Sequence, residues 1–240
     1  MRHGQSPPDG DASTSELRRF ASALESVGRV GGVDEALQLS VDLAVELIAG
    51  VDSADVMLVQ DGEVTVPVAT DGFARRVDEA QRSTGEGPCL TVLRSGEADR
   101  VVVADLRDDE RWPAFRAEAL ELGVRSVHAF RLFRAEEGTD VVGALNLFGR
   151  EPNGDGLVIA LGQVFATHCS VMLRAEIERA GLREALQSRD LIGQAKGILM
   201  ERHKLTADEA FELLRDVSST QNVKVRDLAE QVTETGVLPD

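Results

Sequence analysis

The feature that most constrains this chain is a long stretch that can form one continuous helix. From Asp155 to about Arg202 it contains no helix-breaking residue apart from glycines. An apolar stripe recurs within it at steps of four, four, four and three residues: Phe165, Cys169, Leu173, Ile177 and Ala180. One small domain cannot cover a helix of this length. We therefore expect it to leave an N-terminal domain, to pair with the same helix of a second copy, and to run into a C-terminal segment.

The residues before this helix predict an α+β domain. Residues 1–14 are rich in Pro, Gly and Ser and predict a disordered tail, so the domain is expected over residues 15–175. Helices are predicted over 15–49, 73–82 and 114–122, with a short one beginning near Pro88. Strands are predicted over 54–59, 63–68, 100–104, 124–133 and 140–148, the last two joined by a turn around Gly138. Pro67 cannot donate to a sheet, which favours an edge position for its strand. The pattern predicts an antiparallel sheet of five or six strands with flanking helices.

Residues 176–240 predict a small bundle of three helices, the first supplied by the long helix. Thr206-Ala-Asp-Glu209 fits a capping box, and Leu205 with Ala210 fits the hydrophobic staple beside it. The expected buried faces of the second and third helices are Ala210, Phe211, Leu214 and Val217, then Val225, Leu228, Ala229 and Val232. The third helix is expected to stop near Gly236. A bundle this small is expected to gain stability from dimerisation.

Residues spread over nearly the whole of this C-terminal segment resemble the ANTAR domain of bacterial transcription antitermination regulators. They are Ala185, Arg189, Ile192, Ala195-Lys-Gly-Ile-Leu-Met200, Ala210-Phe211, Leu214-Arg215, Ser218, Asn222, Lys224 and Ala229. Domains of this family bind paired small hairpins in nascent transcripts, generally as dimers, and keep a terminator hairpin from forming. The resemblance implies the same role and the same partner, structured RNA, here.

The N-terminal domain resembles a GAF domain over roughly residues 31–174. The resemblance rests on the order of its elements and on two segments, Gly85-Glu-Gly-Pro-Cys-Leu90 and Gly143-Ala-Leu-Asn-Leu-Phe148. GAF domains are regulatory sensors that often bind a small molecule over the sheet. The resemblance implies a sensor that controls the ANTAR domain, but it identifies neither the ligand nor its contact residues.

The polar residues of the ANTAR-like match are the candidates for RNA contact. Arg189 and Lys196 lie seven residues apart, hence on nearly the same helix face, and Gln194 is expected beside them. The remaining candidates are Arg215, Ser218 and Lys224, around the turn between the second and third helices. The apolar matches are interpreted as core, and Gly197 beside Ala195 as a place where a neighbouring helix approaches closely. Phe211 is the one aromatic residue of the segment and is expected to be buried, which favours phosphate and base-edge contacts over base stacking.

The charge distribution limits how RNA could be bound. The net charge of the chain is −16, although residues 182–226 contain eight basic and seven acidic residues. Long-range attraction to phosphate is therefore weak or repulsive. Binding would have to come from local geometry, which favours folded RNA.

No catalytic, metal or cofactor site is predicted. Cys89 has neither a His nor a second Cys nearby in sequence and is interpreted as a small buried residue. His168 and Cys169 diverge by about 100° on a helix and cannot chelate together. His128 lies in a strand over which a GAF ligand could lie, which leaves an axial haem role open. The acidic loop from Asp105 to Glu110 lacks the spacing of a calcium site, and there is no P-loop or dinucleotide fingerprint.

The chain is expected to be cytoplasmic. It has only two cysteines, an N-terminus without a secretory apolar core, and no apolar run long enough to span a membrane. Two alternatives from other classes stay open. One is a DNA-binding helix-turn-helix regulator. The other is a ligand-sensing or enzymatic protein whose C-terminal bundle serves only dimerisation, although no residue pattern supports an enzyme.

Overall fold

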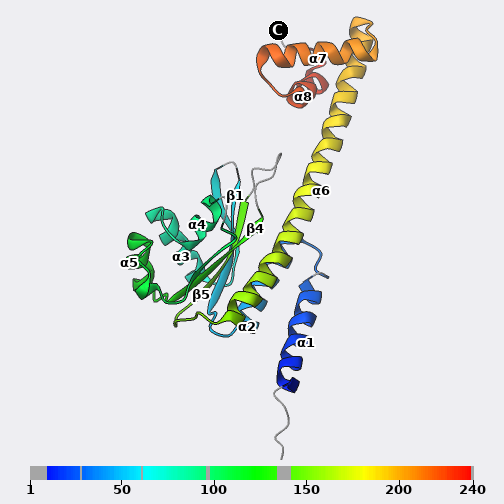
Figure 1. Ribbon diagram of the computed structural model, residues 1–240. Helices are drawn as coiled ribbons and strands as arrows, with labels where there is room; N and C mark the ends of the chain where they lie inside the picture. Colours follow the sequence, from blue (N-terminus) through cyan, green and yellow to red (C-terminus); the bar gives the residue numbers. More distant parts are fainter. Residues whose placement is uncertain (1–9, 28, 61, 96–97, 134–141, 239–240) are drawn as a thin grey trace, which may run out of the picture. The chain divides into compact units, whose positions relative to one another are not determined.

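The computed structural model describes residues 10–27, 29–60, 62–95, 98–133 and 142–238 (Figure 1). The chain divides into two compact units, an N-terminal unit, Met1–Arg174, and a C-terminal unit, Ala175–Asp240. One helix, α6 (Gly156–His203), contributes residues to both. The predicted long helix is thereby confirmed to within one residue at each end.

The N-terminal unit is built on a five-stranded antiparallel sheet. Its strands are β1 (Ser53–Gln60), β2 (Glu63–Ala69), β3 (Arg100–Val103), β4 (Ser126–Phe133) and β5 (Val142–Gly149). Their order in space is β2-β1-β5-β4-β3. Strand β2 lies at an edge, as Pro67 predicts, and the β1–β2 register shifts between Val56 and Leu58. The turn predicted around Gly138 lies outside the described residues.

Helices cover both faces of this sheet. On one face lie α3 (Gly72–Thr84), α4 (Pro88–Arg94) and α5 (Pro113–Glu121), and on the other α2 (Val33–Leu47) and the first part of α6 (Figure 1). A short 3-10 helix, η1 (Leu106–Asp108), precedes α5. Each layer buries its own apolar cluster against the sheet, so the fold is the predicted α+β architecture.

Local signals fix the ends of the helices on the α3–α5 face. The Asp71 side chain caps α3 by accepting hydrogen bonds from the backbone N–H groups of Phe73 and Ala74. Pro88 occupies the first turn of α4, as predicted. Gly123 follows α5 with φ of 89°, a left-handed conformation that favours glycine, so the predicted stop signal is confirmed.

The helix predicted over residues 15–49 is two helices. Helix α1 (Gly10–Val27) ends before Gly31 and Gly32, and α2 begins after Gly32, which has an extended backbone. Two successive glycines weaken a helix because they lose more backbone entropy than other residues on folding. Helix α1 also begins inside the predicted tail, of which residues 1–9 lie outside the described residues.

The apolar stripe predicted to pair α6 with a second copy is largely used within the chain. Phe165, Cys169 and Leu173 are buried in the cluster that α6 and α2 form on the sheet. The prediction was wrong at these positions because the second face of the sheet needs a cover, and α6 supplies it. By length and composition α6 could also cross a membrane, but its first part is a core helix of the N-terminal unit.

The C-terminal unit contains the end of α6 together with α7 (Ala207–Gln221) and α8 (Val225–Thr235). The capping box of Thr206 and Glu209 is present, and α8 ends at Gly236 as predicted. The three helices bury an aliphatic cluster of Ala195, Leu199, Ala210, Leu214, Leu228, Ala229 and Val232.

Two expectations for this bundle were wrong. Phe211 is only partly buried and is not among the cluster's fully buried residues. A Cβ atom added at Gly197 would meet no atom within 4 Å among the described residues, so no helix of the chain packs closely there.

Candidate functional site

The basic residues of the C-terminal unit fall into two groups. Five lysines and arginines are used internally: Arg179 and Arg183 pair with Glu176 (3.8 and 3.2 Å), Lys204 with Glu201 (2.7 Å), Arg226 with Glu184, and Arg202 donates to the Gly236 carbonyl. The other four are Arg189, Lys196, Arg215 and Lys224, and none of them has an ion pair within the described residues. Because an ion-paired cation must give up its partner to bind phosphate, the unpaired group is the better candidate for an anion-binding surface. It consists of the four basic residues predicted to contact RNA.

Lys196 and Arg215 belong to different helices of the unit, α6 and α7, and both lie near Phe211. The Lys196 ammonium sits 5.6 Å from the centre of the Phe211 ring. Arg215 is exposed and follows Phe211 by one turn of α7, on the same helix face. Arg189, also exposed, precedes Lys196 by two turns of α6. The structure thus brings a cation of α6 to the aromatic residue of α7.

The structure does not place Gln194 with Arg189 and Lys196. At about 100° per residue, Gln194 is about 140° from Arg189 and about 160° from Lys196 around α6. It lines an open surface hollow with Gly197, Ile198, Glu201, Arg202 and Gly236. Closeness in sequence was mistaken for closeness on the helix.

Ser218 has a structural role. It is 7% exposed, and its hydroxyl donates a 2.6 Å hydrogen bond to the Val223 carbonyl. This bond ties the end of α7 to the following turn, in which Asn222 adopts a left-handed conformation with φ of 55°. Lys224, the N-cap of α8, is exposed next to that turn. We therefore interpret Ser218 as a residue that stabilises the turn, and we keep Lys224 as a candidate for RNA contact.

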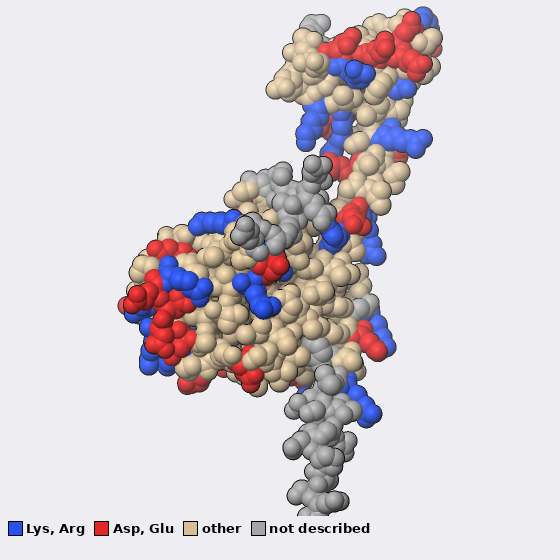
Figure 2. Space-filling view, in the orientation of Figure 1, with Lys and Arg blue, Asp and Glu red and all other residues tan. Residues whose placement is uncertain are grey.

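Charge on the C-terminal unit is mixed. Figure 2 shows Lys and Arg interspersed with Asp and Glu on the side that faces the viewer. A mixed surface gives little long-range attraction to phosphate, as the composition indicates. Any nucleic acid would have to be recognised through the local arrangement of the four unpaired cations.

The N-terminal unit buries a polar cluster between β1, β5 and α3 that the sequence analysis missed. Asn146 Nδ2 donates to Asp55 Oδ1 (2.8 Å), and Gln81 Nε2 donates to Asp78 Oδ1 (3.3 Å). Gln81 also accepts a hydrogen bond from the Cys89 backbone N–H (2.9 Å). All five residues are at most 1% exposed. A carboxyl at an inward position of the apolar strand β1 was the signal in the sequence that could have revealed the cluster.

The two carboxyls of this cluster cannot both ionise freely. Burial raises the pKa of Asp55 well above its usual range, and the neighbouring Asp78 charge adds to the effect. Burial likewise raises the pKa of Asp78, to about 7. Two buried carboxyls that interact in this way hold a proton near neutral pH. The sheet face under α3 and α4 therefore carries a group that titrates in the physiological range.

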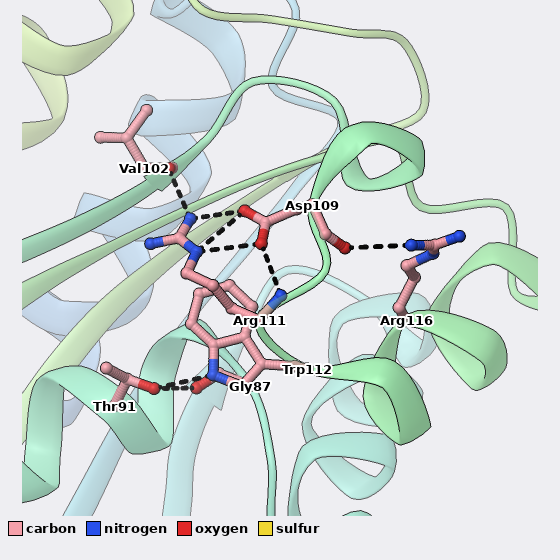
Figure 3. Close-up of polar contacts among 7 residues, drawn as sticks. All are labelled: Gly87, Thr91, Val102, Asp109, Arg111, Trp112 and Arg116. Carbon is pink, nitrogen blue, oxygen red and sulfur yellow. Dashed lines mark hydrogen bonds and ion pairs between the residues drawn. The ribbon is translucent and has the colours of Figure 1, made fainter.

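The loop before α5 is fixed by arginines. Arg111 pairs with Asp109 (2.5 Å), donates to the Val102 carbonyl (3.2 Å) and stacks over the Trp112 ring (4.3 Å) (Figure 3). Trp112 Nε1 donates to Thr91 Oγ1 (2.9 Å), which donates to the Gly87 carbonyl (2.9 Å). These bonds join the loop to α4. The hydrogen bonds from Arg111 lower the pKa of Asp109, so this carboxylate stays ionised within the ion pair.

The other residues considered from the sequence lie in cores. Cys89 and Cys169 are buried, and burial raises the pKa of both thiols, which leaves them poor nucleophiles. Strand alternation puts His128 on the side of Phe130, under α2 and α6, and burial lowers its pKa to about 4. It therefore faces away from the α3–α5 side. Among the described residues no group of three or more His, Cys, Asp or Glu could hold a metal ion.

Two family models match the chain, a GAF domain over residues 32–174 and an ANTAR domain over residues 174–232. No curated protein matches it. The N-terminal unit is similar in fold to the GAF domain of a phosphoenolpyruvate-protein phosphotransferase from Coxiella burnetii, at 17% identity, TM-score 0.52, 69% of this chain and 96% of that one. It is also similar to free methionine-R-sulfoxide reductase from Neisseria meningitidis, at 15% identity and a TM-score of 0.52, with 75% of this chain and 98% of that one covered. A third similar structure is CepR2, a LuxR family transcription factor from Burkholderia cenocepacia, at 16% identity and a TM-score of 0.51, with 68% of this chain and 94% of that one covered. At these identities the likeness concerns the fold alone.

Proposed function

Because the chain belongs to the GAF family and carries an ANTAR domain directly after its GAF domain, we propose that it is an RNA-binding antitermination regulator. Its ANTAR domain binds hairpins in nascent RNA, as a dimer, and thereby keeps a terminator from forming. Its GAF domain senses a signal and controls that binding. The protein acts in the cytoplasm, where nascent transcripts are found.

The observation that carries this proposal is the division of the cations in the C-terminal unit. Arg183, Lys204 and Arg226 are held by carboxylates of their own unit. Arg189, Lys196, Arg215 and Lys224 are left to interact outside the chain. Unpaired Lys and Arg side chains are the groups that bind phosphate, and a folded hairpin presents phosphates at fixed spacings.

Dimerisation is supported by a second apolar stripe on α6. In the N-terminal unit, Leu157, Val164 and Val171 recur every seven residues and are 57%, 41% and 64% exposed. Leu161, His168 and Ala175 fall between them at alternating steps of four and three residues, which is the heptad spacing of a coiled coil. In the C-terminal unit, Leu182 and Leu186 are 67% and 60% exposed, and Leu182 keeps the register of Ala175. The same stripe of a second copy would cover these side chains.

We propose a sensory role for the GAF domain, with no catalysis. A reductase shares its fold, but Cys89 and Cys169 are buried with raised pKa values. A thiol that stays protonated and inaccessible to solvent is not a nucleophile. The core of the domain does contain titratable carboxyls, those of Asp55 and Asp78, whose pKa values are raised by burial.

Binding of the purified full chain to tandem hairpins tests the proposal. The RNA is selected from a pool that carries two short hairpins with randomised loops, and a DNA duplex serves as competitor. The double variant Arg189→Gln, Lys196→Gln should weaken binding about tenfold or more, because it removes two charge-assisted contacts. The matched control Arg183→Gln, Lys204→Gln removes the same charge at ion-paired positions and should bind within about threefold of the parent.

Each other outcome points to an alternative. Preferential binding to the DNA duplex would support a helix-turn-helix regulator. Enrichment of no RNA by the parent protein would contradict the proposal, and would leave a sensor whose C-terminal unit only dimerises. Equal loss in the two double variants would show that net charge, rather than the surface of unpaired cations, drives binding.

A further inference from the structure

The single aromatic residue of the ANTAR domain lies at its surface. The buried cluster of the C-terminal unit is aliphatic throughout, and Phe211 is not among its fully buried residues. Residues 175–240 contain no Trp or Tyr. A phenylalanine has one of the largest apolar surfaces to bury, so a bundle this small would gain stability by placing it inside. Its surface position needs another explanation.

The surroundings of Phe211 are cationic. The Lys196 ammonium lies 5.6 Å from the ring centre, near the outer limit of a cation–π contact. Arg215 follows one turn later on the same face of α7 and is exposed. Neither cation has an ion pair within the described residues. A partly exposed ring beside two cations without an ion pair suits a single-stranded RNA segment, with the ring for a base and the cations for its flanking phosphates.

We propose that Phe211 is the base-recognition residue of the RNA surface, on which one unpaired base of a hairpin loop stacks. Lys196 and Arg215 hold the phosphates on either side of that base. The inference rests on the proposed RNA-binding function and adds the part of the hairpin that is recognised, namely an extruded loop base rather than the duplex stem. It adds one stacking contact to the phosphate and base-edge contacts that the sequence favours.

The proposal is tested by a double-mutant cycle between Phe211 and the loop. The full chain, its Phe211→Leu variant and its Phe211→Tyr variant are titrated with the selected tandem-hairpin RNA. They are also titrated with versions of that RNA in which one loop nucleotide at a time is replaced by an abasic residue. Circular dichroism melting shows whether each variant keeps its fold. Leucine keeps the apolar volume and removes the ring, whereas tyrosine keeps the ring.

We expect Phe211→Leu to bind the intact RNA about tenfold more weakly and Phe211→Tyr to bind within about threefold of the parent, because stacking needs the ring. At one loop position, the abasic change should weaken binding to the parent protein about tenfold and leave binding to Phe211→Leu unchanged. Abasic effects of equal size in both proteins at every position would overturn the stacking role while leaving RNA binding in place. Failure of the parent protein to bind any hairpin would overturn both.

Discussion

Asp78 shows how a single buried side chain gives the sensor domain a property that its fold does not require. The carboxyl lies under α3 against Asp55, where burial opposes ionisation of both. The charged groups that act on the pair are Arg75 and, for Asp78, also Arg82. Gln81 and Asn146 donate hydrogen bonds to it. Because the folded unit keeps protons that the unfolded chain releases, its stability depends on pH.

The sign of this dependence is fixed by the raised pKa values. The stabilising effect of protonated Asp78 is full below the unfolded pKa of about 4. It is lost as the pH rises through the folded pKa of about 7. We therefore expect the free energy of unfolding of the parent chain to contain a component that falls by up to about 1.4 kcal/mol per pH unit in this window. Asp78→Asn should remove that component, and denaturant unfolding at pH 5, 6, 7 and 8 measures it.

The control for this prediction lies on the same helix. Glu79 is exposed and pairs with Arg82 (3.4 Å), so Glu79→Gln removes a charge without changing the buried pair. It should leave the pH dependence of unfolding as in the parent chain. Identical slopes for the parent and Asp78→Asn would show that Asp78 does not hold a proton in the folded state.

At individual positions, the sequence predicted which basic side chains lack an ion pair better than it predicted the contacts of the other side chains. Arg189 and Lys196 were predicted as polar positions of the ANTAR resemblance, their seven-residue spacing placed them on one helix face, and neither has an ion pair among the described residues. Gln194 was misplaced because two residues apart on a helix means nearly opposite faces. The hydroxyl of Ser218 is used by the backbone of the following turn, which no spacing rule indicates. Phe211 was expected inside because large apolar residues usually are.

Among the elements, α6 shows that one helix can carry two apolar stripes with different roles. The stripe of Phe165, Cys169 and Leu173 covers the sheet, and the stripe of Leu157, Val164 and Val171 stays exposed. Periodicity predicted the helix and its length, because no proline interrupts it. It could not tell which stripe faces the chain's own sheet, because that depends on where the strands β4 and β5 meet the helix in space.

The exposed stripe predicts a variant that separates dimerisation from folding. Val171→Glu places a charge in the proposed helix pair and should convert the dimer to a monomer, because the carboxylate would be buried without a partner. Its effect on monomer unfolding should stay within about 0.5 kcal/mol, since Val171 is 64% exposed. Sedimentation velocity measures the change of mass.

Gln163→Glu is the matched control for this variant. It adds the same charge to α6 at a position about 80° from Val171 around the helix, away from the stripe. It should remain a dimer. If Val171→Glu stays dimeric as well, the copies pair through another surface, and the exposed stripe has a different partner.

For the whole molecule, the sequence predicted two domains and their order, and the family models match that order. The buried carboxyl cluster could not be predicted in the same way. It depends on the register that sets Asp55 opposite Asn146 in the sheet and on α3, which brings Asp78 to them. The proposal for the whole molecule is that a signal received by the GAF domain changes how a dimer presents two RNA surfaces.

The central claim is that the protein prevents termination, and single-round transcription measures this directly. A bacterial RNA polymerase transcribes a template whose leader encodes the selected tandem hairpins, the second overlapping a terminator. Read-through past the terminator should rise with the parent protein and with Arg183→Gln, Lys204→Gln. It should stay at the protein-free level with Arg189→Gln, Lys196→Gln. Unchanged termination in the presence of parent protein that binds the same RNA would contradict the antitermination account.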